Sequence, residues 1–345
     1  MTRKLIEPTQ FGQWVEELIM AGEVYAPQAK GNQFAFDRLY HSKDLRLDYD
    51  VTLLPPKKYF HPPDEVLLEF DNKMMRFTSV FEDKPFVLLG VHPYDMAGIS
   101  QLDKVFSMDN PDRHYLTRRE AATIIVSDVQ QASKEVFAGC MGQATMEGKG
   151  GHDMLITLLE DGRYLLDAVT EKGLVLLSSL KDAPEADEAA LKAREQVWVK
   201  NHKQLRQHEL KVAPSELPAL LERSYDHPVW AEKAELCYSC GSCNLVCPTC
   251  YCFDVQDELN WDLTTGHRKR VWDGCMLGEF AAVAGGHNFR SDRAARYRHR
   301  YYRKGSYSWH AYGEIACVGC GRCISACTAK IANPVEVFNR LLEDE

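Results

Sequence analysis

The sequence predicts an α+β protein with an N-terminal α/β domain and a separate, cysteine-rich C-terminal domain. Short apolar runs alternate with helical patterns over the first 180 residues, and a charged segment follows them. Eleven of the twelve cysteines lie between Cys237 and Cys327, and Cys140 alone precedes them. We therefore expect the α/β domain over residues 1–180, a helical linker over 181–225 and the cysteine-rich domain over 226–345.

Local patterns predict the elements of the α/β domain in order. Apolar residues at helical spacing predict a helix over 9–22 that ends at Gly22. The apolar runs 85–91 and 122–127 suit buried strands. Asp95 follows the first of these runs and is placed to cap a helix. We also expect a hairpin over 153–169, which turns at residues 160–162, and a short helix over 170–180.

The linker is predicted to be helical. Residues 182–210 are rich in Ala, Glu, Lys and Gln, which favour helix, and this predicts a long, largely solvated helix. A second, shorter helix is expected after Ser215, whose hydroxyl is placed to cap it.

Composition excludes several classes of protein. Apolar residues make up 45% of the chain, enough for a sizeable core, and the net charge of −9 argues against a dedicated nucleic-acid binder. The N-terminus has no apolar core of a secretory signal, and no apolar run approaches the length of a membrane span. We expect a cytoplasmic protein without membrane contact. Because disulfides rarely persist in a reducing compartment, clustered cysteines there favour metal binding.

The cysteines form two runs with the same spacing, C-x2-C-x2-C-x3-C, which is typical of bacterial ferredoxins with [4Fe–4S] clusters. Three cysteines of each run can surround one cluster, and the fourth then reaches the neighbouring cluster. Two [4Fe–4S] clusters are predicted, and this crossing ties the two runs together. The ligand sets are Cys237, Cys240, Cys243 and Cys327 for one cluster, and Cys317, Cys320, Cys323 and Cys247 for the other.

Zinc is the main alternative, and it normally uses two C-x2-C pairs per ion. Two complete four-cysteine runs fit that pattern poorly. One detail departs from the ferredoxin pattern, because Thr328 stands where a proline, like Pro248 after the first run, is expected.

Three further cysteines, Cys250, Cys252 and Cys275, have two interpretations. They are buried thiols beside the clusters, or they bind a third iron–sulfur cluster or metal ion. The second interpretation needs a fourth ligand, and His287 follows two glycines that allow close approach. Histidine binds iron in Rieske clusters. Iron content distinguishes the two interpretations.

The segment 289–305 holds six arginines and one lysine with tyrosines between them. Such a segment can bind nucleic acid. Alternatively, its cations offset the negative charge of the clusters or contact an acidic partner, and the negative net charge favours this second interpretation. The N-terminal half has no phosphate-binding glycine motif and no nucleophile set, so no catalytic residue is predicted. His92 and Tyr94 fit a packed loop better than a binding site.

Several longer stretches resemble one family. "GVHPYDMAGISQLDKVF", "CYSCGSCNLVCPTCYCFDVQDELN" and "VWDGCMLGEFAAVAGGHNFR" closely resemble the beta subunit of cytosolic NiFe hydrogenases of the sulfhydrogenase type, and the similarity covers nearly the whole chain. They are similar, less closely, to the corresponding subunit of anaerobic sulfite reductase. The resemblance implies an α-helical dicluster ferredoxin fold for the C-terminal domain. It also implies a non-catalytic electron-transfer subunit between a flavin subunit that uses NAD(P)H and a terminal NiFe or sirohaem subunit.

The chain departs from this family in its N-terminal half. Relatives often carry cysteines at the positions of Tyr94 and Asp128 and a close pair near Cys140. An N-terminal cluster is therefore expected to be absent, and a terminal partner of the heterodisulfide-reductase type becomes an alternative. An iron–sulfur protein that binds nucleic acid for regulation is the alternative from another class, and nucleic acid is the less expected partner.

Overall fold

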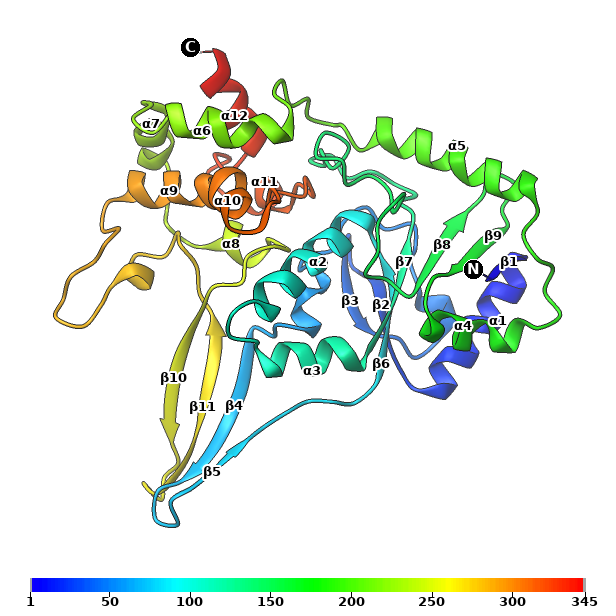
Figure 1. Cartoon of the computed structure of the whole chain (residues 1–345), viewed down its shortest axis with the longest axis horizontal. Helices are drawn as coiled ribbons and strands as arrows, with labels where there is room; N and C mark the ends of the chain where they lie inside the picture. Colours follow the sequence, from blue (N-terminus) through cyan, green and yellow to red (C-terminus); the bar gives the residue numbers. More distant parts are fainter. Residues whose placement is uncertain (1, 344–345) are drawn as a thin grey trace.

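The computed structural model describes residues 2–343, which form a seven-stranded mixed sheet, a four-stranded antiparallel sheet and a group of helices around the cysteine runs (Figure 1). The strands are β1 (Thr2–Ile6), β2 (Glu23–Lys30), β3 (Gln33–Arg38), β4 (Asp64–Asp71), β5 (Arg76–Ser79), β6 (Phe86–Val91), β7 (Ala122–Ser127), β8 (Met154–Leu158), β9 (Tyr164–Ala168), β10 (Phe253–Leu259) and β11 (Thr265–Trp272). The α-helices are α1 (Pro8–Ala21), α2 (Pro93–Ser107), α3 (Arg113–Ala121), α4 (Glu171–Leu176), α5 (Glu188–Gln204), α6 (Leu217–Arg223), α7 (Val229–Glu235), α8 (Ser242–Leu245), α9 (Arg293–Tyr302), α10 (Ser308–Tyr312), α11 (Arg322–Ala326) and α12 (Pro334–Glu343).

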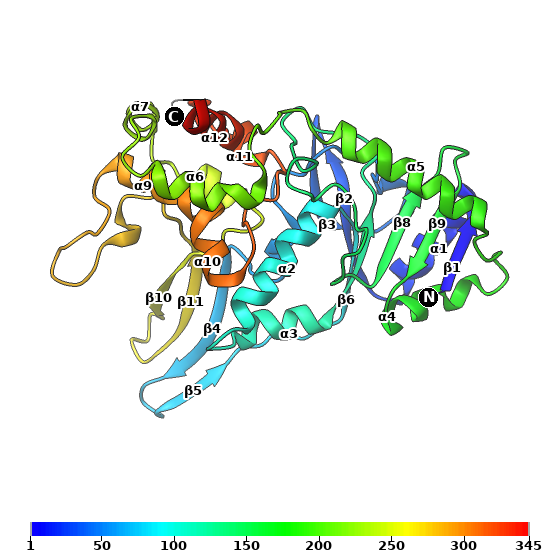
Figure 2. The same cartoon turned by 45° about the horizontal axis from the view of Figure 1, so that its top comes forward.

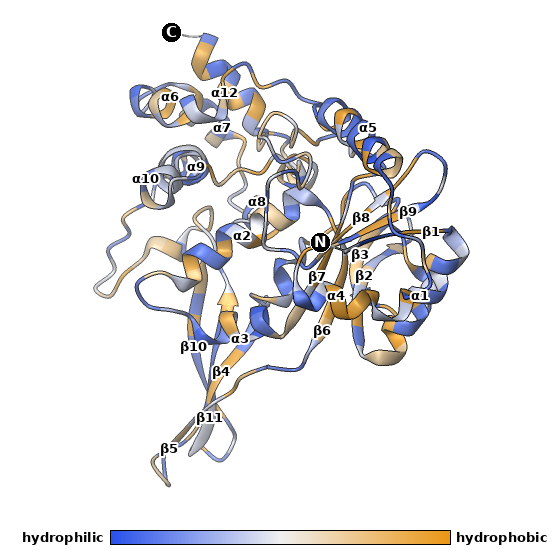
Figure 3. Cartoon of the chain, turned by 45° about the vertical axis from the view of Figure 1, so that its right-hand side comes forward, coloured by the Kyte–Doolittle hydropathy of each residue, from blue (hydrophilic) through white to orange (hydrophobic). Residues whose placement is uncertain are grey.

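The seven-stranded sheet has the order β1-β9-β8-β7-β6-β2-β3, with parallel pairing from β2 through β8 and antiparallel edges. Strand β7 shows why both faces are covered. Its Ile125 belongs to an apolar cluster with Trp14 of α1, whereas Ile124 belongs to another cluster with Tyr115 of α3. Alternate side chains of one apolar strand thus pack into two layers, as in other α/β sheets. Figure 3 shows the contrast between these hydrophobic central strands and the hydrophilic β10.

The predicted elements of this domain are present. The helix expected over 9–22 is α1, the two apolar runs are β6 and β7, and β8 and β9 form the predicted hairpin. Gly162 lies in its turn with φ of 90°, a conformation that glycine adopts without strain.

The linker differs from the expectation at both helices. Helix α5 is shorter than the predicted 182–210, because Asp187 caps its first turn by accepting a hydrogen bond from the Ala190 amide. Ser215 does not cap α6. It lies exposed in a short 3₁₀ turn, Pro214–Glu216, and α6 begins after Glu216 without a side-chain cap.

The four-stranded sheet, with the order β10-β11-β4-β5, forms an arm that extends away from the rest of the molecule (Figures 1 and 2). The hairpin β10–β11 was not among the predicted elements. At the base of the arm, the buried carboxylate of Glu65 on β4 pairs with Arg270 of β11 and Arg118 of α3. Because one sheet joins residues 64–79 to 253–272, the two parts are packed together, and the boundaries at 180 and 226 stay predictions.

The C-terminal helices surround an aromatic core. Trp230 of α7, Tyr301 of α9 and Phe338 of α12 are fully buried in one cluster, and five cysteines of the two runs pack against it. Over residues 2–343, no helix combines the length and apolar character that a membrane span requires.

Candidate iron–sulfur centres

The two cysteine runs fold into the same local structure. In each run a glycine in the left-handed conformation, Gly241 at φ 73° or Gly321 at φ 77°, precedes one short helix, α8 or α11. The helix carries the third cysteine of the run, and α8 and α11 contact each other. The repeated spacing in the sequence therefore produces a repeated loop, and glycine is required because its left-handed backbone costs little.

One cavity is lined by all four cysteines of the first predicted ligand set. Cys237, Cys240 and Cys243 come from the first run, and Cys327 comes from the end of the second. The apolar side chains of Met276 and Ile331 also line this cavity. The structure thus brings together the set that the crossed ferredoxin pattern predicts.

The second predicted set is buried deeper. Cys317, Cys320 and Cys323 lie near one another, and the thiol of Cys247 from the first run lies close enough to affect the pKa of all three. Burial is the main cause that raises the pKa of each of these three thiols to about 12. A buried group of thiols with such pKa values holds negative charge only when a metal replaces its protons.

The donor geometry suits clusters better than a single ion. Within residues 2–343, no three His, Cys, Asp or Glu side chains converge on a point that would hold one metal ion. In a cubane each thiolate binds a different iron atom, so the sulfurs stand apart around a larger group. This arrangement disfavours the zinc alternative and fits [4Fe–4S] clusters.

Buried cations surround the thiols. Arg300 of α9 is 2% exposed and donates a hydrogen bond to the carbonyl of Cys243 at 3.1 Å. Its Nε and Nη1 have no hydrogen-bond partner within the described part of the chain. Lys304 is also buried and donates to Thr249 Oγ1 at 2.7 Å. The arginine-rich segment therefore places charge against the clusters, as its second interpretation expected.

The motif that contains His92 and Tyr94 is a packed loop, as expected. His92 stacks on Tyr49 with ring centroids 3.8 Å apart, and its Nδ1 lies 2.5 Å from the Tyr94 hydroxyl. Asp95 does not cap α2, because His92 occupies that position and the Asp95 carboxylate pairs with Arg322 in the second run. The motif thus docks the α/β domain against the second set of cysteines.

The remaining cysteines share a separate cavity. Cys250, Cys252 and Cys275 all line it, together with His299 of α9. The structure does not bring His287 to this cavity; His287 is exposed and packs edge-on against Phe289, with centroids 4.7 Å apart. His299 was not among the predicted site residues, because no local spacing relates it to the cysteines and only the packing of α9 places it there.

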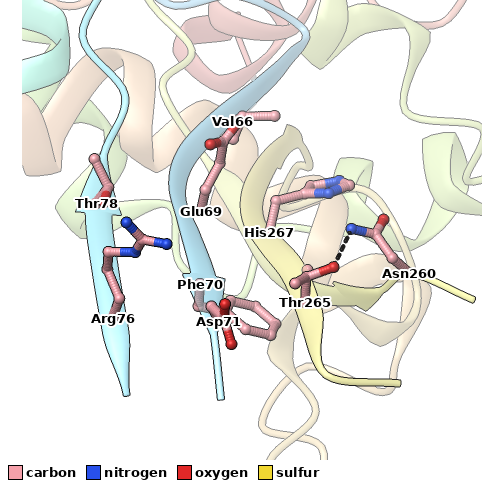
Figure 4. Close-up of a pocket in the computed structure, with 10 residues that line it drawn as sticks. Val66, Glu69, Phe70, Asp71, Arg76, Thr78, Asn260, Thr265 and His267 are labelled. Atoms are coloured by element: carbon pink, nitrogen blue, oxygen red, sulfur yellow. Dashed lines mark hydrogen bonds between the residues drawn. The ribbon is translucent and has the colours of Figure 1, made fainter. Parts of the chain in front are cut away.

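The arm carries an open, mostly polar pocket of its own (Figure 4). Strands β4, β5 and β11 line most of it, and Asn260 donates a hydrogen bond to Thr265 Oγ1 at 2.9 Å beside it. None of the cysteines contributes to this pocket. It is therefore distinct from the candidate iron–sulfur centres.

Comparisons with known proteins agree with this geometry. The model of a 4Fe-4S dicluster domain matches residues 236–331, which hold both cysteine runs. The beta subunit of sulfhydrogenase 2 from Pyrococcus furiosus is 33% identical over 338 residues, which cover 96% of each chain. No solved structure matches the chain significantly. With this identity over almost its full length and the dicluster domain at its C-terminal end, the chain belongs to the sulfhydrogenase beta-subunit family.

Proposed function

We propose that this chain is the electron-transfer subunit of a sulfhydrogenase-type complex, between a flavin subunit that uses NAD(P)H and a terminal redox subunit. One observation carries the proposal: Cys237, Cys240, Cys243 and Cys327 line a single cavity although they come from two runs. When bound, two [4Fe–4S] clusters supply one-electron transfer. The cysteine thiolates hold the clusters, and no residue of this chain is assigned a bond-making step.

The two sites differ in exposure, and this difference gives the relay a direction in space. Cys240 of the first set is exposed, and the neighbouring Tyr238 is 74% exposed. In the second set Cys320 is buried, in an apolar cluster that includes Tyr94 of the α/β domain. The first set thus faces the surface, where a partner can approach, and the second lies at the contact between the two domains.

The protein residues control the charge of both sites. Arg300 lies close to Cys243, Cys247 and Cys323, so one cation serves thiols of both sets. Positive charge beside a cluster stabilises its reduced state, and backbone amides and burial contribute to the same effect. The chain therefore both holds the clusters and sets their potentials.

The proposal is tested by omission of this chain from the reconstituted complex. We expect the flavin subunit to keep its NAD(P)H activity with artificial dyes, and the terminal subunit to keep its own dye-linked activity. Electron flow from one subunit to the other should be lost and should return when the chain is added back. Unchanged flow without the chain would contradict the proposal. The terminal subunit recovered in a native purification distinguishes NiFe, sirohaem and heterodisulfide-reductase-type partners.

The nucleic-acid alternative has less structural support. Arg300 and Arg296 of the basic segment are buried, and Arg296 donates hydrogen bonds to the carbonyl of Ser291 and to Ser239 Oγ. The guanidinium of Arg298 covers the Tyr225 ring at 3.7 Å from its centroid. These arginines are engaged within the protein, and a salt-sensitive gel shift by the loaded protein would be needed to revive this alternative.

A further inference from the structure

We propose that Cys250, Cys252 and Cys275 bind a third iron–sulfur cluster, a [4Fe–4S] cube whose fourth iron is bound by His299. The proposal rests on the function proposed above, since it adds a cluster beside the two of the ferredoxin runs. The three cysteines line one cavity, and His299 is the one other residue among those lining it whose side chain commonly binds iron.

The base of the arm assembles this site. Strand β10 begins at Phe253, directly after Cys252, and its partner β11 ends at Trp272, which pairs with Phe253. The chain stays paired beyond the hairpin, because the Asp273 amide donates to the carbonyl of Cys252 at 3.1 Å. The hairpin thus returns the chain to its starting point and places Cys275 opposite Cys252.

Gly274 allows this return to be close. A Cβ atom at Gly274 would lie 2.8 Å from Cβ of Asn244, a distance that real Cβ contacts essentially never show. The backbone before Cys275 therefore approaches helix α8 directly. This close approach brings Cys275 to the same side chain that contacts Cys250.

Asn244 holds two of the proposed ligands. Its Nδ2 lies 3.4 Å from Sγ of Cys275 and 3.6 Å from Sγ of Cys250, and its Oδ1 accepts a hydrogen bond from the Met276 amide at 3.2 Å. The side chain is 2% exposed and fully engaged. N–H groups directed at ligand sulfurs are a common feature of iron–sulfur sites and tune their potential.

The charges around the cavity call for an anionic occupant. Among the described residues that line it, Arg300, Arg303 and Lys304 are cationic and none is a carboxylate. Arg300 is almost fully buried, and two of its three nitrogens have no partner in residues 2–343. Buried cations without a counter-charge are costly. A thiolate-bound cluster supplies that negative charge, whereas three protonated thiols do not.

The proposed cluster would adjoin both others. Cys250 neighbours Cys247 of the second set, and Cys275 lies close enough to Cys243 of the first set to affect its pKa. Arg300 lines this cavity and also the cavity of the first set. The third site would therefore extend the relay from the paired clusters toward the base of the arm.

Iron and sulfide quantification on the anaerobically purified full chain, with EPR of the reduced protein, tests the proposal. We expect about twelve irons per chain, and about eight in Cys275→Ser and in Cys252→Ser, with the two other EPR signals retained. Cys140→Ser is the matched control, because that thiol lies outside all three sites and contacts the His208 carbonyl; it should keep about twelve irons.

About eight irons in the unaltered chain, unchanged in Cys275→Ser, would overturn the third cluster and leave the proposed function standing. About four irons or none would overturn the proposed function as well, so the two failures are distinguishable. His299→Ala should change the EPR signal that Cys275→Ser removes, and His299→Cys should restore a cluster there. An unaltered signal in His299→Ala would overturn His299 as the fourth ligand.

Discussion

Arg322 of α11 donates hydrogen bonds to both carboxylate oxygens of Asp95 in α2, with N–O distances of 2.5 and 2.7 Å, across 227 positions of sequence. The same guanidinium donates to the carbonyl of Thr52 at 2.8 Å, and all of these groups are buried. Arg322 lies between Cys320 and Cys323, so this pair fixes the second cysteine run to the α/β domain.

Removal of one charge of this pair should be expensive. Asp95→Asn leaves the Arg322 cation buried without its partner, and we expect a loss of about 3–5 kcal/mol in the free energy of unfolding. Denaturant unfolding under anaerobic conditions measures it. Asp48→Asn is the control, because Asp48 pairs with Arg46 on the surface and should cost less than about 1 kcal/mol. Equal losses in the two variants would contradict the proposed docking role.

Gly321→Ala should prevent assembly of the second set. Gly321 has φ of 77°, and a Cβ atom there would lie 2.3 Å from the carbonyl oxygen of Glu135. Gly142→Ala is a matched control, because Gly142 has φ of 68° and open space around it. We expect the control to lose about 1–2 kcal/mol of stability from backbone strain alone. Gly321→Ala should lose more and also bind less iron, and retention of full iron content would argue against a required glycine at this position.

Arg300→Gln should lower the reduction potentials of the clusters. The variant removes a buried positive charge near Cys243, Cys247 and Cys323, so the reduced, more negative clusters become less favourable. We expect a negative shift on the order of tens of millivolts in an EPR-monitored redox titration. Arg298→Gln removes a charge from the same helix that lies over the Tyr225 ring, and it should shift the potentials much less. Equal shifts would show that Arg300 has no special position.

Asp128 should make stability depend on pH. Burial raises the pKa of this carboxyl to about 6, although Thr157 and Trp198 donate hydrogen bonds to it. The folded state thus binds the proton more tightly than the unfolded state, so stability is full below about pH 4 and falls as the pH rises to about 6. Asp128→Asn removes this cost. It should raise stability by up to about 3 kcal/mol at pH 7.5 and by about half as much at pH 5.

Denaturant unfolding at the two pH values measures this difference. A variant that is less stable than the natural chain at pH 7.5 would show that Asp128 is ionised and well stabilised in the folded protein.

The sequence predicted those features that depend on local spacing. The four-cysteine runs specify their loops because each glycine and cysteine acts within a few residues of its neighbours. Helix α1 and strands β6 and β7 were equally predictable, since their apolar patterns face a core directly. The crossed set at Cys327 followed from the same spacing, because the fourth cysteine of each run must point away from the first three.

Features that depend on distant partners could not be predicted. Strand β10 is exposed along its whole length and gains its structure from β11, which itself pairs with β4 almost two hundred positions earlier. Asp95 resembled a helix cap because the sequence does not reveal that Arg322 lies opposite. His299 was hidden for the same reason, and His287 was favoured only because glycines precede it.

EPR of cysteine variants in the reduced, anaerobically purified chain tests the crossed arrangement most directly. If the two runs exchange their fourth ligands, Cys327→Ser should alter the same cluster signal as Cys240→Ser, and Cys247→Ser should alter the signal that Cys320→Ser alters. If Cys327→Ser instead alters the signal that belongs to Cys320, each run holds its own cluster and the crossed ligand sets are wrong.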